Sequence, residues 1–140
     1  KPANATNSDV KWSSSNSLVG RVTQSGKITA LKVGKAVITC TSIDGGYKAT
    51  CTVNSIIGID AVSLNKGAIT LKKNAIFYLK PKIYPADATM TSVRWTSSNT
   101  KVAVVDSNGK VTALKKGTAV ITCTTVQGSY RASCTVTVTD

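Results

Sequence analysis

The sequence predicts an all-β protein of the sandwich type, arranged as two tandem repeats. Val, Ile and Thr are abundant, and residues that branch at Cβ favour strands. Glu is absent, and Leu and Met are few, so the helix signals are weak. Short apolar stretches follow one another at close spacing, with turn signals between them. These observations favour short strands stacked in two sheets.

The repeat is visible without a gap. A shift of 83 residues aligns residues 2–53 with residues 85–136, and about 30 of these 52 positions are identical. "PANAT" matches "PADAT", "VKWSSSN" matches "VRWTSSN", and "ITALKVGKAVITC" matches "VTALKKGTAVITC". Such duplication indicates units that each fold locally. We therefore predict an incomplete first repeat at residues 1–55 and a complete second repeat at residues 56–140.

The second repeat contains strand patterns that turn signals separate. Two short patterns flank "NKG", and Pro81 within the next, longer pattern indicates an edge strand or a bulge. The Asn108-Gly109 step is a strong hairpin signal, and "VQGS" joins the last two patterns. The expected strands lie at residues 61–64, 69–71, 75–84, 93–96, 102–106, 110–114, 118–125 and 130–138.

The last hairpin of each repeat predicts a buried face that carries two cysteines. Alternate residues of its strands are apolar, so one face should point into the core. A hairpin folded about the Gly-Ser step of "VQGS" places Cys123 opposite Cys134. The same fold about the Gly-Gly step of "IDGG" places Cys40 opposite Cys51. Opposed Cα atoms lie about 4.5 or 5.5 Å apart, within disulfide range. Disulfides in an exported protein and buried apolar thiols both fit this pattern.

The remaining candidate residues favour structural roles. Trp12 and Trp95 occupy equivalent strand positions, where a core aromatic is favoured over a ligand-stacking ring. "DSNG" at residues 106–109 is similar to a calcium loop but lacks the downstream acid, which favours a simple turn. His is absent and the six acids are all Asp, so no metal ligand set or acid–base pair is visible. We expect no catalytic residue, no metal site and no cofactor.

The net charge of +12 is spread along the chain. Seven basic and two acidic residues lie in residues 1–55, and eleven and four lie in residues 56–140. This fits a solvated surface, with attraction to an anionic partner as the alternative. Specific nucleic-acid binding is not expected, because no motif is visible. No apolar run reaches the roughly 18 residues that a membrane span needs.

Together, the motifs are similar to the bacterial immunoglobulin-like domain, group 2. The similar segments are "VSLNKG", "PADAT", "VRWTSSN", "VDSNGKVTALKKG", "AVIT" and "CTV", which span nearly all of residues 59–138. The resemblance implies an Ig-like sandwich used in tandem, without shared catalytic residues or a shared ligand site. The family often has Ala at the positions of Cys40 and Cys123, whereas Cys is common at those of Cys51 and Cys134. The paired cysteines depart from this pattern and favour a bridge.

The resemblance implies a non-catalytic structural or adhesion module, a rigid spacer in a tandem Ig-like array. The expected location is extracellular, on a bacterial cell surface or in a secreted protein, or alternatively in a phage virion. One alternative is a module whose basic surface binds an anionic wall polymer, a glycan or a host surface ligand. Another is a strand-donating subunit of a fibre or phage structure. Expected partners are neighbouring Ig-like domains of the same or another chain.

The first repeat is expected to lack its N-terminal strands, because residues 57–84 have no counterpart before Lys1. Its core and sheet edges would then be exposed. Three explanations remain open. The chain is a cut from a longer array, a neighbouring molecule donates a strand to give a strand-exchanged homo-oligomer, or residues 57–84 fold back onto the first repeat.

Overall fold

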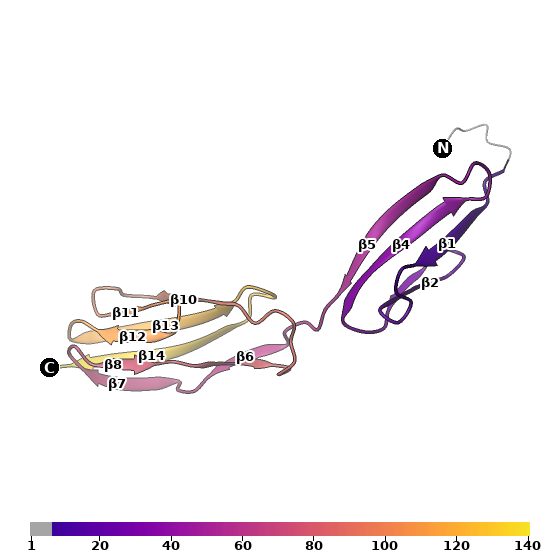
Figure 1. Ribbon diagram of the computed structural model, residues 1–140. Helices are drawn as coiled ribbons and strands as arrows, with labels where there is room; N and C mark the ends of the chain where they lie inside the picture. Colours follow the sequence, from indigo (N-terminus) through magenta and orange to yellow (C-terminus); the bar gives the residue numbers. More distant parts are fainter. Residues whose placement is uncertain (1–6) are drawn as a thin grey trace. The chain divides into compact units, whose positions relative to one another are not determined.

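The structure, a computed structural model, describes residues 7–140, and every regular element in this range is a β-strand. The all-β prediction is therefore confirmed. The first "PANAT" turn lies outside the described residues. The chain divides between Ile56 and Ile57 into two compact units, each with its own sheets (Figure 1).

The second unit is a sandwich whose core lies between two sheets. One sheet has the strand order β10-β13-β14-β7, the other has the order β11-β12-β8, and β6 pairs with β9 (Figure 1). The strands are β6 (Ala61–Leu64), β7 (Ala68–Lys72), β8 (Ile76–Tyr78), β9 (Pro81–Tyr84), β10 (Val93–Ser97), β11 (Ala103–Val105), β12 (Lys110–Ala113), β13 (Gly117–Thr125) and β14 (Arg131–Thr139).

The core of the second unit draws side chains from both sheets. Ile121 and Val136 from one sheet and Val111 from the other are each 0% exposed. Leu79, between β8 and β9, is also 0% exposed and belongs to the same cluster. The alternation predicted for the last hairpin is confirmed here, because alternate residues of β14 are buried.

Within residues 7–56, the first unit repeats the later strands of the second unit, and no strand there corresponds to β6–β9. Its sheets have the orders β1-β4-β5 and β2-β3. The fold-back hypothesis is wrong, because β7 pairs with β14 and β8 pairs with β12 of the second unit. The strands are β1 (Val10–Ser14), β2 (Gly20–Val22), β3 (Ile28–Ala30), β4 (Gly34–Ser42) and β5 (Lys48–Ser55).

The single strand predicted at residues 75–84 is wrong, because two strands, β8 and β9, occupy this range. Between these two strands the chain changes its pairing partner, because β8 pairs with β12 and β9 pairs with β6. At the switch, the Leu79 amide donates to the carbonyl of Gly109 at 2.9 Å. The Lys80 amide donates to the side-chain oxygen of Asn65 at 2.8 Å. Pro81 begins β9 opposite Leu64.

The predicted register of the last hairpins is wrong by two residues. Cys123 lies opposite Ala132 rather than Cys134, and Cys40 lies opposite Ala49 rather than Cys51. A shift of two residues keeps each side chain on the same face of its strand. The predicted face of each strand is therefore unchanged, although the predicted pairing of residues across the hairpin is wrong.

The loop explains the register. The loop spans four residues rather than two, because the Thr125 amide donates to the carbonyl of Tyr130 at 2.9 Å. The Thr125 hydroxyl donates to the carbonyl of Gln127 at 2.7 Å and accepts from the Tyr130 amide at 2.9 Å. Gly128 and Ser129 have φ values of 76° and 55°, in the left-handed region. In the first unit, Ser42 makes the same contacts with its own loop.

Candidate functional site

The cysteines form no bridge, and their environments differ between the units. All four are free thiols, and diagonal cross-strand neighbours lie about 7–8 Å apart, beyond the usual disulfide range. Cys123 and Cys134 are 0% exposed, and burial raises the pKa of both thiols because it disfavours the thiolate. Cys40 is half-buried and Cys51 is exposed.

The two tryptophans contact turn glycines of their own units. Both indoles are half-buried, and Trp95 packs against the core cluster of the second unit. A Cβ atom added to Gly109 would lie 2.9 Å from the Trp95 ring, and one added to Gly26 would lie 3.0 Å from the Trp12 ring. Each indole ring therefore lies with its edge against a tight turn of its own unit.

The aspartates are surface residues, and one of them, Asp106, stabilises a turn. The Asp106 carboxylate accepts from the amides of Asn108 and Lys110 at 2.8 and 3.0 Å, so "DSNG" forms a turn held by its own side chain. All six aspartates are exposed. Among residues 7–140, no group of three or more His, Cys, Asp or Glu residues is placed to hold a metal ion.

A depression of about 410 Å³ lies along β9 of the second unit. The Lys82 ammonium, at its border, lies 5.2 Å from the centroid of the Tyr84 ring. The lining of the depression combines one cation with apolar groups and a hydroxyl. Such a set is suited to contact with another molecule rather than to acid–base chemistry. The lining residues are Pro81, Lys82, Ile83, Ala86 and Thr91.

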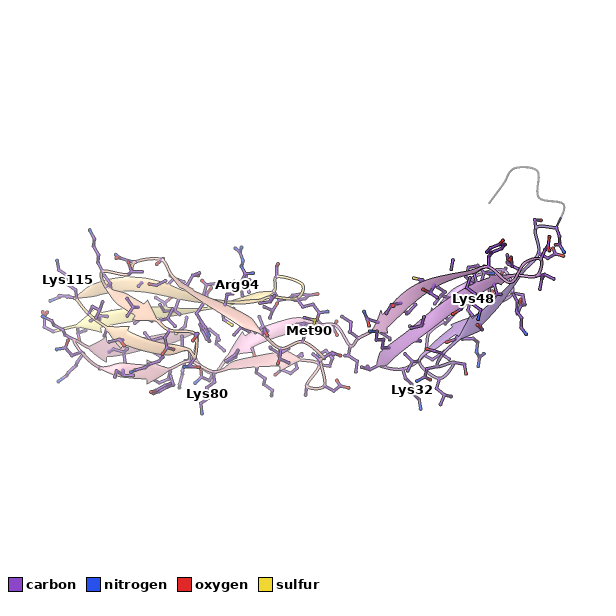
Figure 2. The ribbon with its side chains drawn as sticks, turned by 45° about the horizontal axis from the view of Figure 1, so that its top comes forward. Lys32, Lys48, Lys80, Met90, Arg94 and Lys115 are labelled. Carbon is purple, nitrogen blue, oxygen red and sulfur yellow. The ribbon has the colours of Figure 1, made fainter. Side chains whose placement is uncertain are left out.

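The basic side chains are distributed over different elements of both units. Figure 2 shows Lys32 and Lys48 projecting from the first unit, and Lys80, Arg94 and Lys115 projecting from the second. Within residues 7–140, one ion pair is present, between Lys116 and Asp140 at 2.6 Å, and both of its side chains are largely exposed. Such a pair contributes little to stability. The positive charge is therefore mostly uncompensated and not gathered into one patch.

The largest difference between the units lies at the edges of the first unit. In the part of the chain that the structure describes, no strand pairs with the outer sides of β3 and β5, and we call these two sides the open edge. In the second unit, β8 covers the edge of β12 and β7 covers the edge of β14, which are the counterparts of β3 and β5. Ile28 of β3 is 39% exposed, whereas its counterpart Val111 is 0% exposed. The sequence signalled this edge only through the missing counterpart of residues 57–84.

Sequence reasoning missed the role of Leu79 in closing the second unit. It lies in the segment predicted as a continuous strand, where its apolar side chain resembles any other strand residue. The available signal in the sequence was its place directly before Lys80 and Pro81, where the proline already predicted an irregularity.

Comparison with protein families and with known proteins gives a consistent result. The family model of the bacterial Ig-like domain (group 2) matches residues 1–53 and 59–136. An uncharacterised protein of Clostridium acetobutylicum is 40% identical over 99% of the chain, which spans 15% of that protein. An Ig-like virion protein of Serratia phage KSP90 is 34% identical over 98% of the chain, which spans 55% of that protein.

Two further matches extend the comparison. The lacto-N-biosidase of Bifidobacterium bifidum is 50% identical over 53% of the chain, which spans 6% of that protein. Domains 4 and 5 of the S-layer protein SbsC match 95% of the chain and 72% of their own length, with 20% identity and a TM-score of 0.50. This structural likeness concerns the fold alone. Within residues 7–140, the structure has no helix of the length and apolarity needed to cross a bilayer.

Proposed function

Because the chain belongs to the bacterial Ig-like domain (group 2) family, we propose that it is a non-catalytic module that spaces other parts of an extracellular or virion protein. The family resemblance in the sequence is confirmed by the match over both repeats. The relatives support a modular role. One is named as an Ig-like virion protein and another as a lacto-N-biosidase, and this chain spans only part of each. The same small sandwich thus accompanies unrelated activities.

The observation that carries this proposal is the way in which the second unit holds the linker. The Ile57 amide donates to the Thr89 hydroxyl at 2.9 Å, and the Thr89 amide donates to the Ile57 carbonyl at 3.0 Å. Ile59 is 5% exposed, and β6 begins two residues later. Only Ile56 separates the end of β5 from this clamped segment. A short segment of this kind between two folded units suits a spacer.

Small-angle X-ray scattering tests the spacer proposal. The wild-type chain should give a narrower distribution of interatomic distances than a variant with about 12 Gly and Ser residues inserted between Ile56 and Ile57. Thr89→Val, which removes the hydroxyl that holds Ile57, should broaden the distribution, whereas the neighbouring Thr91→Val should not. A wild-type distribution as broad as that of the insertion variant would refute a spacer function.

The second candidate is a module that binds an anionic polymer. Its support is the net charge of +12 together with the exposed, mostly unpaired cations. Purified teichoic acid is a suitable probe, and a neutral polysaccharide of similar size is the control. Binding should be strong at about 10 mM salt and much weaker at about 150 mM, because the screening length falls from about 30 to about 8 Å. Absence of binding at the lower salt concentration would eliminate this candidate.

A further inference from the structure

The four-stranded sheet of the second unit carries two arginines in one row, with a threonine between them. β10, β13 and β14 lie side by side in this sheet (Figure 1). Arg94 of β10 lies opposite Thr124 of β13, and Thr124 lies opposite Arg131 of β14. We call these three residues the arginine row.

The side chains of the arginine row lie on the outer face of the sheet. Trp95, which follows Arg94, packs against the core cluster, and Thr125, which follows Thr124, is 1% exposed. Successive residues of a strand point to opposite faces, so the row points to solvent. Arg94 and Arg131 are both exposed, and Figure 2 shows Arg94 projecting from the second unit.

The spacing of the strands lets the two arginines act together. Neighbouring strands lie about 4.8 Å apart, so the Cα atoms of Arg94 and Arg131 lie about 10 Å apart, with Thr124 midway. Their long side chains can converge above Thr124. Each guanidinium group presents a planar fork of N–H donors, and the threonine hydroxyl adds a further donor.

No acidic side chain in the sheet balances this charge. The strands β7, β10, β13 and β14 contain no aspartate, and Glu is absent from the chain. Among residues 7–140, neither arginine takes part in an ion pair. Two cations in one row repel each other, and a bound anion would replace this repulsion with attraction.

The choice of arginine is specific to this row. The chain has three arginines among its 18 basic residues, and two of them are Arg94 and Arg131. In the first unit, the corresponding row has lysines, because Lys11 lies opposite Thr41 and Thr41 lies opposite Lys48. Arginine binds oxyanions through paired hydrogen bonds, whereas lysine acts as a point charge.

The acids next to the lysine row are also replaced in the second unit. Asp9 and Asp44 lie close to that row in the sequence, and their counterparts are Ser92 and Gln127. The first unit therefore has two acids beside two lysines, whereas the second has two arginines and neither acid. Both changes favour an anion at the arginine row.

The donors of the row identify the kind of anion. Three donor groups and two positive charges suit a group with three terminal oxygens, which phosphate and sulfate monoesters have and a carboxylate lacks. The face of a sheet offers a small ligand little contact area. A polymer that carries many such esters compensates, because each release is followed by rebinding at a high effective concentration.

We propose that the arginine row binds a phosphate or sulfate monoester carried on a polymer. This inference rests on the second candidate function, the binding of an anionic polymer, and assigns that function a site and a chemical group. The two guanidinium groups donate to the terminal oxygens of the ester from both sides, and the Thr124 hydroxyl donates from below.

Derivatives of one polysaccharide test the chemical group. Dextran sulfate, dextran phosphate and carboxymethyl dextran of equal size and degree of substitution are compared by biolayer interferometry with the whole chain. At about 50 mM salt, where charges are only partly screened, the sulfate or the phosphate ester should bind at least about fivefold more tightly than the carboxylate. The tighter of the two esters identifies the source. Equal affinity for esters and carboxylate would overturn the assignment of the group.

Matched variants test the site. Arg94→Gln with Arg131→Gln should weaken ester binding by at least about tenfold, because charge-assisted hydrogen bonds are lost. The control, Lys80→Gln with Lys115→Gln, removes the same charge from exposed positions of the same unit and should cost less than about threefold. Replacement of both arginines with Lys keeps the charge and should abolish the preference for esters over carboxylate.

The outcomes separate this inference from the candidate function on which it rests. If the two glutamine double variants bind the esters equally well, anionic-polymer binding stands and the arginine row is not its site. If the wild-type chain binds dextran sulfate, dextran phosphate and teichoic acid no better than unmodified dextran, the candidate function and the site both fail.

Discussion

Replacement of Leu79 with Ala should destabilise the second unit by about 3 kcal/mol. Leu79 is 0% exposed within the core cluster, and its amide holds the Gly109 carbonyl at 2.9 Å. Loss of about three carbon atoms from a buried site removes roughly 2.4 kcal/mol of transfer free energy, and the cavity that remains adds to this. The backbone hydrogen bond persists, so the effect measures packing.

Equilibrium unfolding in guanidinium chloride measures this loss. Each unit contains one of the two tryptophans, so a Trp12→Phe background leaves Trp95 as the fluorescent reporter of the second unit. With a slope of about 2 kcal/mol/M, the midpoint should fall by about 1.5 M.

The matched control is Leu114→Ala in the same unit. Leu114 is 38% exposed and lies outside the core cluster, so its replacement should cost less than about 1 kcal/mol. Similar midpoints for the two variants would refute the assignment of Leu79 as the residue that closes the core.

Three further predictions follow from the turns and the thiols. Gly109→Ala should be more destabilising than Gly26→Ala. Both glycines have left-handed φ values, but only at Gly109 would an added Cβ atom clash with a backbone carbonyl, that of Leu79; thermal unfolding of each unit compares the two variants. Thr125→Val should lower the free energy of unfolding by about 1–3 kcal/mol, because it leaves the loop amide of Tyr130 without its hydroxyl partner, and chemical denaturation checks this. At pH 8, Cys51 should react rapidly with Ellman's reagent and Cys134 only after unfolding, because Cys134 is buried and its pKa is raised; equal rates would contradict the burial.

The class and faces of the strands could be predicted because they depend on local pattern. Alternation in β14 identifies its inward face, and the same alternation is buried in the structure. The register could not be predicted in the same way. It depends on the Thr125 side chain, which holds a four-residue loop, and on Ser129, which adopts a left-handed conformation without being glycine.

The segment at residues 75–84 shows a different limit. Its apolar residues suit one long strand, and Pro81 signalled an irregularity without showing its form. The division into β8 and β9 arises because β12 and β6 offer edges in different sheets. Competition between distant partners cannot be inferred from the segment alone.

Cys51 and Cys134 separate what the sequence determined from what the tertiary structure decided. Both lie in "CTV", in strands that the sequence alone assigns to the same place in two copies of one unit. Nevertheless, Cys134 is fully buried and Cys51 is exposed. Local pattern sets which way a side chain points. Burial is set by the strands that cover it, and residues 57–84 provide those strands for only one of the two copies.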